Sequence, residues 1–337
     1  MAKDSYHEIT LSPGENAVTS MLVDSKHRML YVATAESNFR YSLEISSAHI
    51  VAIRTSDLEK TGNLVLPAGE NPLSTGIIDS SSEALYFGTY GDPNRSVPAR
   101  VIKVQIPGLK LRQAADLGKT TFGVSSVLLD STHNAGYFGT LFGNVVGFQL
   151  SDMSVFASLG LQREDNAFTT AVIDPAGTYG YFATISGNII KIRLSDFSPV
   201  ANLTLFRKEK GFTCAVIDPS GDYAYFGTGG SPAKIVRLSL LTFSAHGIIT
   251  LNPGESKLQA GYMDAANDVI YFVSAQAPAK LITIQRSSFK RKGVIPLPFS
   301  NQMPSCTAMD IPRKTLYFAI DDQPAKINQI RIDVHSP

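Results

Sequence analysis

Seven aspartates recur along the chain, and regularly spaced carboxylates are a natural place to look for acid–base chemistry. Each lies seven residues before a tyrosine, and successive aspartates are 44 to 55 residues apart. Asp174 and Asp218 each begin the sequence Asp-Pro-x-Gly, in which the aspartate accepts backbone N–H groups, proline presets φ and glycine takes a positive φ. We therefore interpret the set as turn residues and disfavour a ring of catalytic carboxylates. Its members are Asp24, Asp79, Asp130, Asp174, Asp218, Asp264 and Asp310.

The six histidines are the other candidates for chemistry, as metal ligands or general bases. His27 and His133 fall in the aspartate turns, and His7, His246 and His335 are scattered, so the spacing predicts no metal site. Neither a Gly-x-Ser-x-Gly nucleophile motif nor a glycine-rich phosphate loop is present. We predict no metal, no cofactor and no catalytic residue, while a catalytic pair of carboxylates stays open as an alternative.

The spacing of the aspartates defines a repeat, and repeats of about 40 to 50 residues with short strand-like segments are typical of propeller blades. The fifth repeat, residues 211–251, contains four segments rich in β-branched and aromatic residues, which we name strands A to D. The turn aspartate joins A to B, and B ends in Tyr-Phe-Gly-Thr in three repeats. The sequence predicts one all-β domain over residues 1–337, a seven-bladed β-propeller of four-stranded antiparallel blades. The blades should start near residues 17, 72, 123, 167, 211, 257 and 303.

The last repeat lacks its fourth strand, and the chain begins with one. His7–Glu15 matches His246–Glu255, which is a strand D and the loop that follows it. We expect residues 5–12 to complete the seventh blade beside the C-terminal strands, because a closed fold leaves no strand edge unpaired at the chain ends.

A column of small hydroxyl-bearing residues lies five positions before most of the turn aspartates, as at Ser125, Thr169 and Thr213. Strand A is the innermost strand of a blade, where little space is left for side chains. We interpret the column as filling of that space, with a small-ligand or ion site as the alternative.

Charged residues recur at two places that should share one side of the molecule, the side carrying the D–A and B–C loops. Either they form ion pairs between blades, or they form a charged rim that recognises a polar ligand or a protein. The acidic residues are Glu15, Glu70, Asp165, Glu209 and Glu255. The basic residues, each after Pro-Ala, are Arg100, Lys234, Lys280 and Lys326.

The same side carries two insertions, at residues 35–48 and 90–97, and loops on a regular scaffold often carry function. They contain residue types that are common at recognition surfaces, although tolerated surface insertions are the alternative. The candidate ligand- or partner-binding residues are Phe39, Arg40, Tyr41, His49, Tyr90 and Arg95.

Composition excludes several classes of protein. The formal net charge is +1 and basic residues are scattered, so we predict no nucleic-acid binding. Apolar runs are only of strand length, so we predict no membrane span. Tryptophan is absent, which argues against tryptophan-aspartate repeats and other propellers that depend on it. Cys214 and Cys306 occupy equivalent positions two repeats apart, and we expect buried thiols there, which would favour a reducing compartment.

The segment Val216–Thr228 resembles the YVTN-type β-propeller repeat, and Tyr31-Val-Ala-Thr34 comes close to its name motif, with Ala and Thr in place of Thr and Asn. The resemblance covers all seven repeats through short motifs and implies a seven-bladed propeller. It also favours an extracellular or cell-surface location, although no signal peptide is visible at the start of this chain.

Fold does not select function, so two functions remain open. The first is a non-enzymatic binding or scaffold propeller that contacts a protein or glycan through the D–A/B–C loop side, as a module of a larger assembly. The alternative, a lactonase-like hydrolase with its site at the channel mouth, is implied by the resemblance alone.

Overall fold

The computed structural model describes residues 6–36, 47–67, 72–79, 81–94, 96–161, 167–206, 210–298 and 302–332. These residues form seven four-stranded antiparallel sheets, and one 3-10 turn follows β22 at Ala265–Asn267. The sheets are the blades of an all-β, seven-bladed β-propeller, as the repeat predicts. By internal contacts the chain divides into two compact units, residues 1–124 with 304–337 and residues 125–303.

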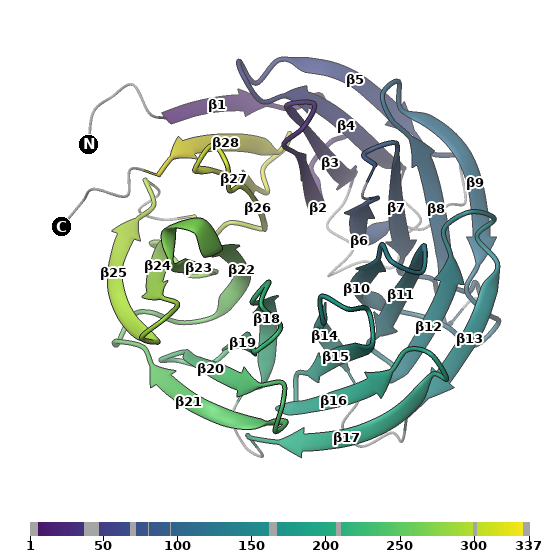
Figure 1. Ribbon diagram of the computed structural model, residues 1–337. Helices are drawn as coiled ribbons and strands as arrows, with labels where there is room; N and C mark the ends of the chain where they lie inside the picture. Colours follow the sequence, from purple (N-terminus) through teal and green to yellow (C-terminus); the bar gives the residue numbers. More distant parts are fainter. Residues whose placement is uncertain are drawn as a thin grey trace. The chain divides into compact units, whose positions relative to one another are not determined.

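The first unit contains blades 1, 2 and 7, and the strand labels follow Figure 1. Blade 1 comprises β2 (Ala17–Asp24), β3 (Met29–Ala35), β4 (Ala48–Arg54) and β5 (Lys60–Val65). Blade 2 comprises β6 (Leu73–Ile78), β7 (Ala84–Thr89), β8 (Arg100–Gln105) and β9 (Lys110–Asp116). Blade 7 comprises β26 (Cys306–Asp310), β27 (Thr315–Ile320), β28 (Lys326–Arg331) and β1 (Tyr6–Thr10).

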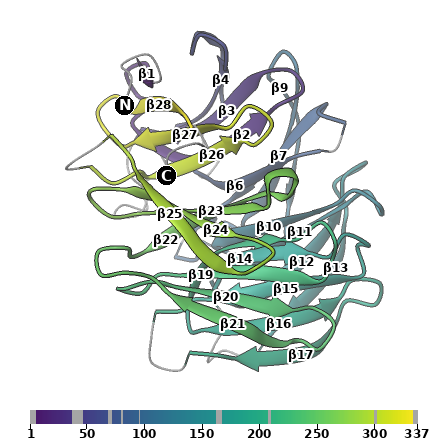
Figure 2. The same cartoon turned by 60° about the vertical axis from the view of Figure 1, so that its left-hand side comes forward.

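The second unit contains blades 3 to 6, whose strands are easiest to follow in Figure 2. Blade 3 comprises β10 (Val124–Asp130), β11 (Ala135–Thr140), β12 (Asn144–Gln149) and β13 (Val155–Gly160). Blade 4 comprises β14 (Phe168–Ile173), β15 (Tyr179–Thr184), β16 (Asn188–Arg193) and β17 (Ser198–Thr204). Blade 5 comprises β18 (Phe212–Ile217), β19 (Tyr223–Thr228), β20 (Lys234–Ser239) and β21 (Ser244–Thr250). Blade 6 comprises β22 (Leu258–Asp264), β23 (Val269–Ser274), β24 (Lys280–Gln285) and β25 (Lys290–Pro296).

The N-terminal strand completes the last blade, as the match between the chain start and a strand D predicts. β1 pairs antiparallel with β28, with Ile9 opposite Ile327 and Tyr6 opposite Ile330 (Figure 1). Ile9 packs against the buried cluster that contains Leu11 and Ile327. The two ends of the chain are therefore joined by backbone hydrogen bonds and by apolar burial.

The core consists of clusters between neighbouring blades. Strand B is buried on both faces: all six residues of β7 and of β11 are buried. In blade 5 the strand-B tyrosine Tyr225 and the following Phe226 are at most 1% exposed. The fourth strands consist of half-buried and exposed residues, which alternate regularly in blades 1 and 6, so the blades pack face to face and present these strands to solvent.

The seven aspartates are turn residues, which confirms the structural interpretation. Each accepts a hydrogen bond from a backbone N–H two to four residues ahead, as Asp174 does from Thr178 at 2.7 Å. Gly177 and Gly221 take the positive φ that the Asp-Pro-x-Gly turn requires, 68° and 78°. The aspartates therefore fix the A–B turns.

In blades 3 to 5 the hydroxyl column on strand A joins neighbouring blades, whereas Thr19 and Ser74 donate to carbonyls of their own blade. The side chains of Ser125, Thr169 and Thr213 donate to the carbonyl oxygens of Phe168, Phe212 and Leu258, each in the next blade of the second unit. This geometry supports the structural interpretation of the column. Cys214, beside Thr213, is buried, and desolvation raises the pKa of its thiol to about 12. Cys306 is half-buried, in contrast to the expectation that both cysteines are buried.

Candidate functional site

The D–A and B–C loops meet at one side of each blade, which we call the loop face. In blade 5 the backbone N–H of Ala233, at the start of strand C, donates to the carbonyl of Glu255 in the following D–A loop, at 2.9 Å. In blade 7 Ala325 donates in the same way to Glu15. The N-terminal loop thus takes the place of a D–A loop, and the two charge-bearing segments predicted to share a side do so.

Glu255 is a buried carboxylate that holds its loop from within. Its side chain is 3% exposed, and one oxygen accepts the backbone N–H of Asn252 at 3.1 Å. The other oxygen accepts from the guanidinium of Arg291, on β25, at 2.5 Å. A buried carboxylate needs such partners, because burial without them strongly disfavours its charged form.

Glu15 repeats this arrangement in blade 1. Its side chain is 1% exposed, and it accepts the backbone N–H of Ser12 at 2.8 Å. The ammonium of Lys60 lies 2.6 Å from its other oxygen, and the amide of Asn63 donates to that same oxygen at 2.8 Å. Each of the two loops is fixed by its own carboxylate, which bridges the loop backbone and the fourth strand of the following blade.

Lys60 and Arg291 are the residues that sequence analysis missed. They occupy the same register position, since Lys60 pairs with Ile53 on β4 and Arg291 pairs with Ile284 on β24. The other blades with a described fourth strand after a D–A loop carry Leu111, Val155, Pro199 and Ala245 at this position. Aligning the fourth strands of the repeats would have singled out the two cations.

The four basic residues after Pro-Ala do not contact the two described rim carboxylates. Each has its own partner: Arg100 pairs with Asp116 at 3.0 Å, Lys326 with Asp322 at 3.2 Å, and Lys280 donates to the carbonyl of Gly254 at 2.8 Å. Lys234 lies over the ring of Phe206, 5.2 Å from its centroid. The adjoining alanines, which are Ala99, Ala233, Ala279 and Ala325, are completely buried.

The described part of the second insertion is an ordered loop. Asp92 and Val97 exchange backbone hydrogen bonds, and the buried carboxylate of Asp92 accepts the N–H of Asn94 at 2.9 Å. The half-exposed Tyr90 donates its N–H to Pro72 and accepts from Gly123 through its carbonyl. The loop is therefore tied at its base to the D–A loops on either side of blade 2.

His49 lies inside a strand, paired with Thr34 on one side and Val65 on the other. Its Nδ1 is 3.5 Å from the amide nitrogen of Asn63, so it stands next to the Glu15 site on the same outer layer of blade 1. The remaining predicted residues lie outside the described part of the chain. They are Phe39, Arg40, Tyr41, Glu70, Arg95, Asp165 and Glu209.

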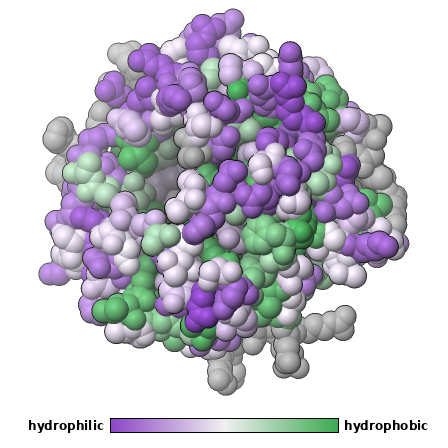
Figure 3. Space-filling view, turned by 45° about the vertical axis from the view of Figure 1, so that its right-hand side comes forward, coloured by the Kyte–Doolittle hydropathy of each residue, from purple (hydrophilic) through white to green (hydrophobic). Residues whose placement is uncertain are grey.

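The surface is chemically mixed: in Figure 3 hydrophilic residues cover much of the visible face, with small hydrophobic patches between them. Among the described residues no three His, Cys, Asp or Glu side chains are grouped closely enough to hold a metal ion. Within the same residues, no helix has the length and apolar character needed to cross a membrane.

No family model matches the chain, and no curated protein matches its sequence.

Proposed function

We propose that this chain is a non-enzymatic binding propeller that recognises a protein or glycan through its loop face. The observation that carries the proposal is the internal fixing of two loops of that face. The carboxylates of Glu15 and Glu255 each accept one backbone N–H of their loop and pair with one cation of the adjoining strand. Both glutamate side chains are less than 4% exposed. Such loops are held in place before a partner arrives, which lowers the entropy lost on binding.

The contact residues in this proposal are those of the two insertions. Arg40, Tyr41 and Arg95 carry the residue types that contribute most to binding free energy at interfaces. The Asp92–Val97 bridge and the bonds of Tyr90 fix the base of the second insertion. The resemblance of the repeats to the YVTN type supports a place among cell-surface or scaffold propellers.

The test compares two triple variants in the same binding assays. The first replaces Arg40, Tyr41 and Arg95 with alanine. The matched control replaces Lys110, Arg112 and Lys290 with alanine in the same way. These residues are exposed, and their strands begin at the C–D turns, on the side opposite to the loop face. Both are probed on a glycan array and by cross-linking pull-down from extracts of the producing cells.

We expect the first variant to lose its bound glycans or cross-linked proteins at least tenfold, with an unchanged melting temperature, while the control retains them. Equal binding by both variants would reject this surface. Turnover of a lactone panel by the wild-type chain would replace the proposal with the hydrolase alternative.

A further inference from the structure

Lysines gather on the loop face of blades 5 and 6, although basic residues are scattered in the sequence. In the described part of the chain, the loops that lead into these blades and their B–C loops comprise residues 205–206, 210–211, 229–234, 251–257 and 275–280. These segments contain four lysines and a single carboxylate, that of Glu255. Glu255 is buried and accepts from the guanidinium of Arg291, which neutralises its charge. The segments therefore carry an excess of positive charge.

Lys210 and Lys257 reach the same turn from two different D–A loops. The turn is the B–C turn of blade 5, which begins with Gly229 and Gly230. A Cβ on Gly229 would lie 3.7 Å from Cβ of Lys210, and the carbonyl of Gly230 accepts the backbone N–H of Lys257 at 3.0 Å. Both lysines are exposed, and neither forms an ion pair with a described residue. Their two ammonium groups are thus left to pair with a ligand that lies across this turn.

Lys280 adds a third ammonium group beside the loop that carries Lys257. It donates to the carbonyl of Gly254, at 2.8 Å. In blades 2 and 7 the cation after Pro-Ala is paired with a carboxylate instead, as Arg100 is with Asp116. A carbonyl does not neutralise a cation, so Lys280 keeps its full positive charge for a further partner.

The neutral groups between these lysines are polar. The hydroxyl of Ser256, a residue that is 5% exposed, donates to the hydroxyl of the exposed Ser231 at 2.9 Å. None of the exposed large apolar side chains of the described chain lies in these segments. Protein interfaces depend on aromatic and apolar anchors, and single-stranded nucleic acids stack their bases on aromatic rings. Carbohydrate hydroxyls need neither, because they bind through polar groups such as these.

We propose that Lys210, Lys257 and Lys280, around the turn Gly229–Ser231, form a lysine surface that binds an anionic polysaccharide through its sulfate or carboxylate groups. Lysine presents a point charge on a flexible stem, so it can follow anionic groups that repeat along a flexible chain without the fixed geometry that arginine imposes. Binding here rests on the proposed function of the loop face and names the chemical class of the partner.

The experiment measures binding of the whole chain to immobilised polymers at several salt concentrations. Dextran sulfate presents sulfate groups, polygalacturonate presents carboxylates, and neutral dextran is the uncharged control. Polyglutamate and a single-stranded oligonucleotide represent the other two classes of polyanion. Opposite charges attract less as salt rises, so the salt dependence reports how far the contact is electrostatic.

We expect saturable binding of at least one anionic polysaccharide that weakens with salt, and no binding of dextran. Tighter binding of dextran sulfate would identify sulfate as the recognised group, and tighter binding of polygalacturonate would identify carboxylate. Either order supports the surface. Equal or tighter binding of polyglutamate or of the oligonucleotide would overturn the proposal, because it would show that any polyanion is attracted.

Two triple variants test the three lysines. Replacing Lys210, Lys257 and Lys280 with glutamine removes their charges, whereas replacing them with arginine keeps the charges. We expect the glutamine variant to bind the polysaccharide about tenfold more weakly and with a shallower salt dependence, because about three fewer counterions are released. The arginine variant should stay within about threefold of the wild-type chain.

The matched control replaces Lys110, Arg112 and Lys290 with glutamine, which removes the same charge at exposed positions away from the loop face. It should bind as the wild-type chain does, and equal weakening in the control would show that only net charge matters. If the wild-type chain binds neither anionic polysaccharide, the lysine surface is rejected, while the cross-linking pull-down with the insertion variant still decides the proposed function.

Discussion

At the residue scale, the recurring polar groups of this chain act mainly on its own backbone. The turn aspartates accept backbone N–H groups, the strand-A hydroxyls of blades 3 to 5 donate to carbonyls of the next blade, and the described rim carboxylates Glu15 and Glu255 hold loops. Sequence spacing identified all three sets because each recurs at a fixed offset. It could not identify Lys60 or Arg291 as partners, since each lies more than 30 residues from its glutamate and is brought close only by blade pairing.

The ion pair of Glu255 with Arg291 should be worth more than an exposed pair. We expect a double-mutant cycle of Glu255→Ala and Arg291→Ala to give a coupling free energy of about 1–3 kcal/mol, because the carboxylate is buried although the guanidinium is partly exposed. Urea unfolding measures it. The cycle for Arg193 and Asp196, both exposed, should give a clearly smaller coupling free energy, because solvent screens the pair. Equal coupling in the two cycles would show that Glu255 does not hold its loop.

The hydroxyl of Thr169 should contribute through its bond to the next blade. Thr169→Val keeps the shape of the side chain but leaves the carbonyl of Phe212 without this donor, and we expect a loss of about 1 kcal/mol in the free energy of unfolding. Thr250→Val, at an exposed position on β21, serves as the control and should change stability by less than about 0.5 kcal/mol. A loss no larger at Thr169 than at Thr250 would contradict the inter-blade role.

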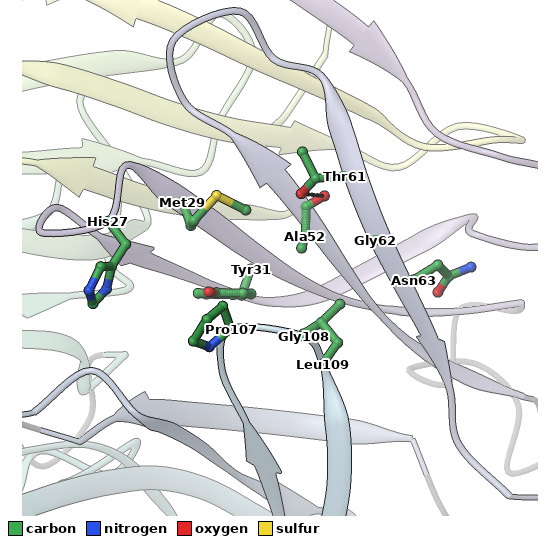
Figure 4. Close-up of a pocket in the computed structure, with 10 residues that line it drawn as sticks. All are labelled: His27, Met29, Tyr31, Ala52, Thr61, Gly62, Asn63, Pro107, Gly108 and Leu109. Carbon is green, nitrogen blue, oxygen red and sulfur yellow. Dashed lines mark hydrogen bonds between the residues drawn. The ribbon is translucent and has the colours of Figure 1, made fainter.

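At the scale of elements, the four strands of each blade could be predicted from the sequence because their boundaries coincide with turn residues. The completion of blade 7 by β1 was equally visible, since the chain start repeats the sequence of a strand D. The contact of the C–D turn of blade 2 with blade 1 was not, because Leu109 and Ala52 come together only from neighbouring blades (Figure 4). The candidate loop residues of the first insertion, such as Arg40, stay predictions.

Burial of Ile9 should be what attaches β1 to blade 7. Ile9→Asp places a charge against the apolar cluster of Leu11 and Ile327 and should lower the free energy of unfolding by about 2–3 kcal/mol. The neighbouring His7→Asp puts the same charge at an exposed position and should have little effect. Thermal and urea unfolding compare them, and equal stability of the two variants would show that β1 does not depend on this contact.

At the scale of the whole molecule, the sequence predicts one domain over residues 1–337. The unit that contains blades 1, 2 and 7 is built from both ends of the chain, so neither end segment holds all of it. We therefore expect scanning calorimetry to show a single unfolding transition whose van't Hoff and calorimetric enthalpies agree. Two resolved transitions would show that the two units unfold independently.

Both proposed sites depend on the seven-bladed propeller, and its chain closure can be measured by a single cross-link. Ile9 and Ile327 face each other across β1 and β28, whereas Ile330 lies opposite Tyr6. Mild oxidation of the variant with cysteines at positions 9 and 327, followed by peptide mass spectrometry, should give a disulfide between the two introduced residues in most molecules. The control with cysteines at 9 and 330 should give little. Efficient linkage in the control, or none at 9 and 327, would contradict closure of the last blade by the N-terminal strand.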